Sequence, residues 1–290
     1  MLPCSASELR VVEQYKADPD QDKEMHVDYL PVIFRLEELQ CLSPMCWLNS
    51  QTINSYLAIV QRKVRSGRVH IGNSFFMSKV LSDSRNAKTW VKGVCKSNKC
   101  SSMYDLHRLC FPYNIRQLHW VAVCCDFLSL TITLIDSLPG RDHDSALQQL
   151  KNFLESTLCT TGVGRGSQPV WNVQVRDDKA FRQENSYDCG LFTIGHVTLC
   201  ALKQENRLGT VTQESVTHMR ERVYHDLVMN EIKFEVYGYT HGDGYTHHGD
   251  STTGSSGNSG GVDGSGGSRG VGGDGGCGCG GGGGGRKWTR

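Results

Sequence analysis

Glycine is distributed so unevenly along the chain that it decides which part can fold. Of the 33 glycines, 23 lie between Gly238 and Gly285, and from about Asp243 onward the sequence is mostly Gly, Ser, Asp and Thr. Such a segment buries too little apolar surface to offset the conformational entropy lost on ordering it. We therefore predict a Gly/Ser-rich disordered tail over residues 238–290.

The rest of the chain is long enough for one domain. Residues 1–28 are polar and are predicted to be loosely ordered, which leaves a domain over residues 29–237. This span of about 210 residues can build one substantial hydrophobic core. We expect it to act as a monomer.

The overall charge and hydropathy exclude several classes of protein. The net charge of +1 lacks the basic excess of a general nucleic-acid binder, so no nucleic-acid partner is expected. No apolar run approaches the about 20 residues of a membrane-spanning helix, and the first residues do not read as a signal peptide. We expect a nuclear or cytoplasmic protein whose 13 cysteines are mostly free thiols.

The apolar periodicity of the domain predicts an α+β fold. Runs rich in β-branched residues over 120–125, 130–135 and 170–175 indicate strands, and amphipathic patterns outside them indicate helices. The helices are expected from Ile53 with Asn49 or Ser50 as N-cap, from Ser145 behind Asp144, and after Thr212.

The two central strands place a histidine beside an aspartate. If residues 126–129 form the turn of a hairpin, Cys125 pairs with Leu130, and His119 then lies opposite Asp136. Residues directly opposite each other have Cβ atoms about 4.5–5.5 Å apart, which allows a hydrogen bond between imidazole and carboxylate. Capping of the strand ends is the alternative interpretation of the pair.

A cysteine stands at the start of a predicted buried helix. The run QENSYDCGLFTIGHV (residues 183–197) is apolar on nearly all sides after Asp188, which is typical of a buried helix. With Asp188 as N-cap, Cys189 lies in the first turn, where the helix dipole stabilises a thiolate. Gln183 can supply an amide donor to a developing oxyanion. The alternatives are an inert buried thiol and an ordinary loop glutamine.

The order and spacing of these residues resemble the Ulp/SENP family of ubiquitin-like-modifier proteases. The similarity covers about residues 29–232 and keeps the order of the family motifs. The matching segments are Trp47-Leu48-Asn49 before a helix, Asn73–Phe76, Phe111–Ile115, His119-Trp120, Ile135–Leu138 with Asp136 seventeen residues after His119, and Gln183-x5-Cys189-Gly190.

The resemblance implies a papain-like cysteine protease fold of the Ulp/adenain type, with a central sheet and flanking helices. By the residues that match, Cys189 is the expected nucleophile and His119 the general base and acid. Asp136 is expected to orient the histidine. Gln183, with the backbone N–H of Cys189, is the expected oxyanion-hole donor.

The resemblance also implies a substrate. Trp47 and Trp120 match tryptophans that line a narrow tunnel for the modifier's terminal Gly-Gly in this family. The expected reaction is cleavage after the Gly-Gly of SUMO or a related modifier, by deconjugation or precursor processing. The family's WLND aspartate is Ser50 here, at a position that tends to face the modifier, so the identity of the modifier stays open.

Two other functions remain open at this point. Relatives of the same clan include proteases with other substrates and acyltransferases that use the same His, acidic residue and Cys. An inactive modifier-binding relative is the third candidate. Cys95 and Cys100 are close in sequence, but no second pair accompanies them at zinc-ligand spacing, so no metal site and no cofactor are expected.

Overall fold

The computed structural model describes residues 3–27, 32–64, 68–82, 84–138, 140, 143–158 and 170–232. The predicted tail from residue 238 lies outside the described residues, as do both ends of the predicted domain. Within the described ranges, no helix combines the length and apolar character needed to cross a membrane.

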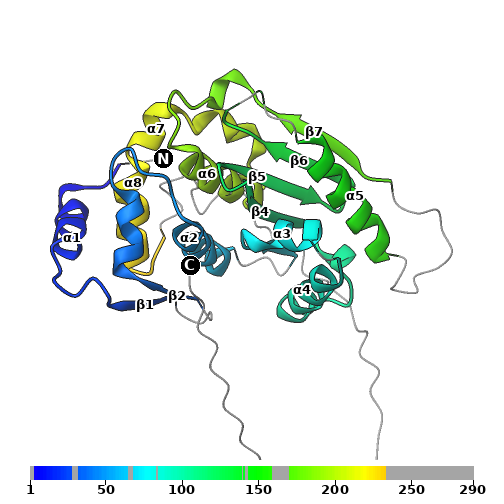
Figure 1. Cartoon of the computed structure of the whole chain (residues 1–290), viewed down its shortest axis with the longest axis horizontal. Coiled ribbons are helices and arrows are strands. Elements are labelled where there is room, and N and C mark those ends of the chain that lie inside the picture. Colours follow the sequence, from blue (N-terminus) through cyan, green and yellow to red (C-terminus); the bar gives the residue numbers. More distant parts are fainter. Residues whose placement is uncertain are drawn as a thin grey trace, which may run out of the picture. The chain divides into compact units, whose positions relative to one another are not determined.

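A five-stranded mixed sheet forms the centre of the fold, in the order β3-β4-β5-β6-β7 (Figure 1). Of the inner strands, β5 is antiparallel to both β4 and β6, whereas the edge strands β3 and β7 are parallel to their neighbours. A separate antiparallel pair, β1 with β2, lies near the N-terminus. The strands are β1 (Glu24–Val27), β2 (Val32–Arg35), β3 (Val69–Ile71), β4 (Arg108–Ile115), β5 (His119–Asp126), β6 (Thr131–Ile135) and β7 (Asn172–Arg176).

Helices cover both faces of this sheet, so the predicted α+β class with flanking helices is confirmed (Figure 1). The β5 residues Trp120, Ala122 and Cys124 belong to a core shared with α1, α2, α6 and α8. The alternate residues of β5 belong to a second core with α3, α4 and α5. The helices are α1 (Ala6–Lys16), α2 (Ser50–Lys63), α3 (Phe75–Ser82), α4 (Ser84–Ser97), α5 (Asp144–Leu158), α6 (Cys189–Ala201), α7 (Gln213–Thr217) and α8 (Met219–Val228).

The predicted helices are present with small changes at their ends. The Asn49 side chain accepts from the backbone N–H of Thr52 at 2.7 Å, so Asn49 is the N-cap of α2 and Ser50 is its first residue. Helix α5 begins at Asp144 itself. The third predicted helix is divided at His218 into α7 and α8.

The prediction that residues 1–28 are loosely ordered is wrong for the described part. Helix α1 begins with a capping box, in which Ser5 and Glu8 each bond the other's backbone N–H. Val12 is buried, and Arg222 of α8 donates to both carboxylate oxygens of Glu8 at 2.9 Å. These contacts attach the N-terminal helix to the core. The capping-box pattern is present in the sequence, so the start of this helix could have been predicted.

The predicted register of the central hairpin is also wrong, by two residues. Cys125 pairs with Ile132, and the turn occupies residues 127–130 with Leu130 at φ 51°. Because side chains alternate between the faces of a sheet, a shift of two residues leaves every side chain on its predicted face. His119 and Asp136 therefore still meet.

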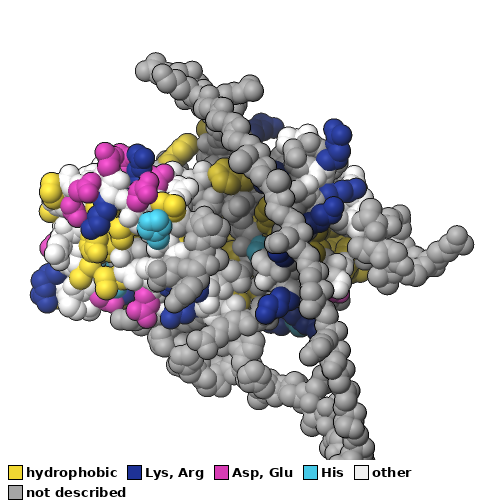
Figure 2. All heavy atoms as spheres, turned by 90° about the horizontal axis from the view of Figure 1, so that it is seen from below, with side chains coloured by type: hydrophobic (Ala, Val, Ile, Leu, Met, Phe, Trp, Pro, Cys, Tyr) yellow, Lys and Arg dark blue, Asp and Glu magenta, His cyan; other side chains and the backbone are white. Residues whose placement is uncertain are grey.

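Charged side chains are unevenly distributed on the face shown in Figure 2. Acidic ones gather at the end formed by the N-terminal elements, with basic ones among them, while basic ones predominate over much of the remaining described surface. Helix α4 contributes to this difference, since it contains three lysines and one arginine but no acidic residue.

Candidate active site

The structure brings together the cysteine, histidine and aspartate that the sequence singled out. Nε2 of His119, the first residue of β5, lies 2.6 Å from Oδ1 of Asp136, directly after β6. The Cys189 thiol lies close enough to the same ring to raise the pKa of His119. All three side chains are buried, with 3 % exposure at most. With Nε2 engaged by Asp136, Nδ1 is the ring nitrogen left for the thiol.

Electrostatics favour an ion pair at the histidine. Burial lowers the pKa of His119, but its hydrogen bond to Asp136 and its interaction with Cys189 outweigh this effect and raise the pKa from 6.5 to about 9. Burial raises the pKa of Asp136, whereas its bonds to His119 and His143 bring it down to about 2. The Asp136 carboxylate is therefore charged at neutral pH and stabilises an imidazolium beside the thiol.

This shift predicts a specific loss of stability at high pH. A histidine whose pKa is raised by folding contributes stability that is complete below pH 6.5 and is lost as the pH rises through about 9. An NMR titration of the His119 ring should show a midpoint near the upper value. In Asp136→Asn the midpoint should fall and the loss of stability over this pH range should shrink. An unchanged midpoint in Asp136→Asn would contradict the conclusion that Asp136 raises the pKa of His119.

A second histidine binds the same carboxylate, and sequence reasoning did not find it. His143 Nε2 lies 2.9 Å from Asp136 Oδ2, and the backbone N–H of Leu138 donates to Oδ1 at 2.8 Å. Asp136 is thus held on both oxygens. His143 precedes α5 in a part of the sequence without a strong periodic signal, so nothing short of the tertiary structure places it here.

The nucleophile candidate begins helix α6, and Asp188 is its N-cap residue as predicted, but the Asp188 side chain makes no capping hydrogen bond. Its backbone carbonyl accepts from Leu191 and Phe192, while its carboxylate turns away. Oδ1 accepts from Arg220 at 2.6 Å, and Oδ2 accepts from Asn185 and Gln213. A buried carboxylate needs such donors, and they compete with the cap.

Arg220 fastens two loops that frame the site. Besides Asp188, its guanidinium donates to the backbone carbonyls of Cys41, Ser43 and Cys46, at 2.9–3.2 Å. Cys46 directly precedes Trp47, and Asp188 directly precedes Cys189. One buried side chain on α8 therefore fixes both segments, a role that no sequence motif signalled.

Removing this guanidinium should destabilise the protein strongly. In Arg220→Met the buried charge of Asp188 loses its partner, which typically costs about 3–5 kcal/mol of unfolding free energy. Chemical denaturation measures this cost, and Lys92→Met on the exposed side of α4 is the control. A double variant with Asp188→Asn should recover part of the loss. Equal unfolding free energies of Arg220→Met and the control would show that the contacts of Arg220 contribute nothing to stability.

The Trp47–Leu48 segment packs against the turn that presents Cys189. Leu48 accepts at its carbonyl a hydrogen bond of 3.0 Å from the Trp120 indole N–H. A Cβ on Gly190 would lie 2.9 Å from the Leu48 Cβ, so only glycine fits after the cysteine without a shift. The two predicted tunnel residues differ in burial, since Trp120 is 5 % exposed and Trp47 50 %.

Gln183 is buried beside the triad and oriented by its neighbours. Its Oε1 accepts from the Ser137 hydroxyl at 2.8 Å, and its Nε2 donates to the Asn185 carbonyl at 2.6 Å. One of the two amide hydrogens remains available for another acceptor. The side chain is thus fixed in place by Ser137, the residue after Asp136.

Residues 46–231 match the family model described as Ulp1 protease family, C-terminal catalytic domain. The chain belongs to the Ulp1 protease family. The match lies within the predicted domain and includes all four candidate catalytic residues and both tryptophans.

Relatives of this Ulp1-family chain share sequence at a modest level. It is 28 % identical over 167 residues to the Ubiquitin-like-specific protease ESD4 of Arabidopsis thaliana, covering 56 % of this chain and 34 % of that protein. With Sentrin-specific protease 3 of Homo sapiens it shares 25 % over 225 residues, covering 76 % and 36 %. The chain thus spans about a third of the length of these curated relatives.

Solved structures of the family have the same fold. The C-terminal Ulp1 protease domain in complex with Smt3, the yeast ortholog of SUMO, superposes with a TM-score of 0.64 at 18 % identity, covering 79 % of this chain and 97 % of that one. The Chaetomium thermophilum Ulp1-like SUMO protease catalytic domain gives a TM-score of 0.62 at 21 % identity, covering 80 % and 92 %.

The geometry of this Ulp1-family site predicts a measurable role for His143. A hydrogen bond to a charged group is worth about 1.5–3 kcal/mol, so His143→Ala should lower kcat by about tenfold or more through a less well held Asp136. His143→Gln should retain part of the activity. The pH profile distinguishes a role of His143 in positioning Asp136 from a general loss of structure. The midpoint of the His119 titration should fall in His143→Ala only if Asp136 has moved. Wild-type kcat and an unchanged profile would rule out the role.

Proposed function

We propose that the chain is a cysteine peptidase that cleaves after the C-terminal Gly-Gly of SUMO or a related ubiquitin-like modifier. The observation that carries the proposal is the buried His119–Asp136 hydrogen bond of 2.6 Å, together with a buried Cys189 close enough to raise the pKa of that histidine. A nucleophile, a base within hydrogen-bonding reach and a group that orients the base are the parts that covalent acyl transfer requires.

The reaction follows from these positions. His119 takes the thiol proton, and the Cys189 sulfur attacks the carbonyl carbon of the terminal glycine. The backbone N–H of Cys189 and the free amide hydrogen of Gln183 stabilise the oxyanion that forms. His119 then protonates the leaving amine, which leaves a thioester between the modifier and Cys189. A water molecule deprotonated by His119 hydrolyses this thioester and restores the thiol.

The choice of a modifier as substrate rests on the relatives and on the two tryptophans. Curated relatives are named sentrin-specific and ubiquitin-like-specific proteases, and one solved relative holds Smt3. Trp120 donates to the carbonyl of Leu48, Trp47 directly precedes Leu48 in the chain, and Leu48 packs against Gly190. Ser50, in place of the family aspartate, leaves the choice among modifiers to experiment.

Two other functions need a separate test. An acyltransferase of the same clan would use the same three residues, whereas an inactive modifier-binding relative would not need them assembled. The buried hydrogen-bonded set favours an active enzyme. Acetyl transfer from acetyl-CoA to a protein substrate, without modifier cleavage, would favour the transferase.

Modifier probes test the proposal directly. The full chain is incubated with a panel of modifiers that carry a C-terminal vinyl sulfone, SUMO and ubiquitin among them, and with the same panel after Cys189→Ala. We expect one covalent adduct per chain with SUMO or a close relative, absent in the variant. Failure of every probe to label the wild-type protein would overturn the proposal.

We also propose that the protein acts in the nucleus or cytoplasm. The ten cysteines within the described residues are free thiols, as expected for a reducing compartment. Imaging of the tagged full chain tests this location.

A further inference from the structure

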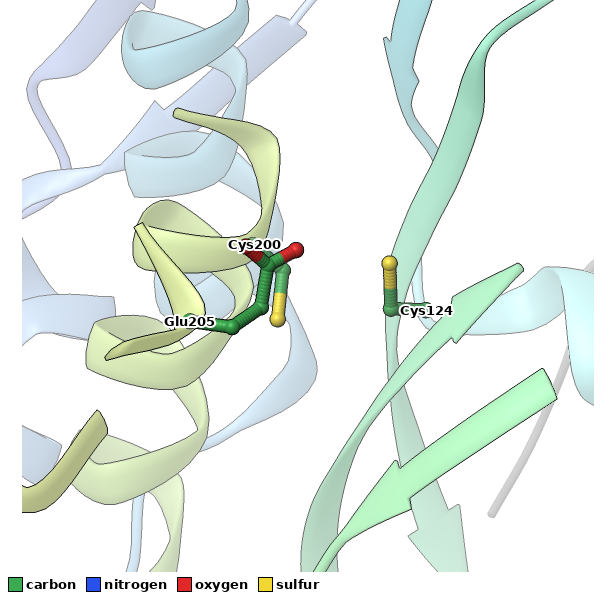
Figure 3. Close-up of side chains that lie close together, drawn as sticks. All are labelled: Cys124, Cys200 and Glu205. Carbon is green, nitrogen blue, oxygen red and sulfur yellow. The ribbon is translucent and has the colours of Figure 1, made fainter. Parts of the chain in front are cut away.

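A cluster of buried thiols lies away from the catalytic residues, beneath the far end of α6. The ligand atoms of Cys124, Cys200 and Glu205 all lie within 4.8 Å of one another (Figure 3). Cys124 comes from β5, Cys200 from the last turn of α6, and Glu205 from the 3-10 turn that follows. Three separate elements therefore direct sulfur and carboxylate ligands to one point.

A further thiol adjoins Cys124, outside the set of ligand atoms that all lie within 4.8 Å of one another. Cys110 of β4 pairs directly with Cys124 across the sheet, and their sulfur atoms are 3.4 Å apart. In a tetrahedral site with zinc–sulfur bonds of about 2.3 Å, two sulfur ligands are about 3.8 Å apart. The spacing of this pair is close to that value, and Cys110 is fully buried.

The donor set determines the class of ion. Thiolate sulfur selects soft or borderline cations, and a closed set of cysteines with one carboxylate suits zinc rather than magnesium or calcium, which prefer oxygen alone. No redox change is needed, because each thiol that binds releases a proton to solvent.

The surrounding charges are compatible with a bound cation. Arg108 donates to the carboxylate of Glu205 through Oε1, which leaves Oε2 for a metal, and it also pairs with Asp126 at 3.1 Å. Three thiolates and a carboxylate together outweigh the charge of zinc and of this one guanidinium. The Glu205 side chain is 35 % exposed, which gives an ion a path from solvent.

The cluster lies at the opposite ends of α6 and β5 from the active-site residues. Cys189 and Cys200 are at opposite ends of α6, and His119 and Cys124 are five residues apart on β5. At 1.5 Å per helical residue and about 3.3 Å per strand residue, both separations come to about 16 Å. A link between Cys124 and Cys200 would therefore fasten the distal ends of the two elements that present the nucleophile and its base.

We infer that Cys124, Cys200 and Glu205 form a structural site for a zinc-like divalent cation, with the neighbouring Cys110 thiol drawn in as the fourth ligand when the ion binds. The ion then links α6 to β4 and β5. The site is separate from substrate cleavage, since among the described residues its ligands come from the opposite ends of α6 and β5 to Cys189 and His119. The cysteines are 14 and 76 positions apart in the chain, unlike those of a compact zinc motif, which is why the sequence did not indicate the site.

Cobalt(II) binding tests the site in the full chain. A Cys189→Ser background removes the catalytic thiol as a competing ligand, and the reduced, metal-stripped protein is titrated with Co²⁺. We expect one ion per chain with the absorption bands of thiolate-to-cobalt charge transfer, and displacement by Zn²⁺. Zn²⁺ should also raise the melting temperature.

Matched variants separate this site from other thiols. Cys124→Ser should abolish the charge-transfer bands, whereas Cys125→Ser, the next residue on the opposite face of β5, should leave them unchanged. Glu205→Gln, at the partly exposed rim, should fold normally and bind at least about tenfold more weakly. No bound ion, equal binding by the Cys124 and Cys125 variants, or oxidation of Cys110 and Cys124 to a disulfide without bound metal would overturn the inference.

Discussion

Replacing Cys189 with alanine is expected to lower the turnover of a Gly-Gly modifier substrate by at least about 10⁴-fold. Removing the nucleophile of such a triad abolishes covalent catalysis and leaves only what binding and oxyanion stabilisation contribute. The rate of modifier release, followed with a fluorogenic C-terminal amide, measures the effect. Because the side chain that remains is small and apolar, the fold and the affinity for the modifier should change little.

Two other cysteines serve as controls for this result. Cys46→Ala removes an exposed thiol next to Trp47, and Cys125→Ala removes a buried thiol on the strand that carries His119. Both should retain turnover, even if the second lowers the melting temperature. Wild-type turnover in Cys189→Ala, or loss of turnover in Cys46→Ala with an intact fold, would disprove the assignment of the nucleophile.

Much of the fold could be predicted from the sequence because its elements have strong local signals. The stripe of α2, the all-apolar α6 and the central strands follow from periodicity alone. Their assembly around the site was harder. The meeting of His119 with Asp136 was predicted from an incorrect register, and it held only because an error of two residues preserves the face of the sheet.

The residues that sequence reasoning missed act through contacts between distant segments. Arg220 reaches carbonyls about 175 residues earlier in the chain, and the thiols of Cys124 and Cys200 come together from separate elements. No local pattern encodes either arrangement. Asp188 shows the same limit, since it is the predicted N-cap residue, but its carboxylate accepts from a buried arginine instead of from the helix backbone.

The two tryptophans should make the enzyme selective for glycine at the end of the modifier. A tunnel narrow enough to admit only backbone excludes every residue with a Cβ, so a Gly-Gly substrate should be cleaved far faster than the same modifier with alanine at either position. The Trp120 indole is anchored by its bond to the Leu48 carbonyl, and Trp47, the residue before Leu48, is half-exposed. The Trp120 ring is therefore held in place, while the Trp47 ring is accessible to a substrate.

Trp120→Ala is expected to lower kcat by about 10²-fold, since a misplacement of about 1 Å can cost that much, and to narrow the difference between glycine and alanine substrates. Its buried ring also supports the core, so its loss should lower stability by about 3–5 kcal/mol.

Trp47→Ala separates the effect on selectivity from the effect on stability, because a half-exposed ring can be removed with little loss of stability. It should still lower kcat/KM for the Gly-Gly substrate and relax the selectivity. Steady-state rates for Gly-Gly and Gly-Ala substrates with the three proteins measure both quantities. If the wild-type enzyme accepts alanine nearly as well as glycine, no tunnel exists, and the site is that of a general thiol protease.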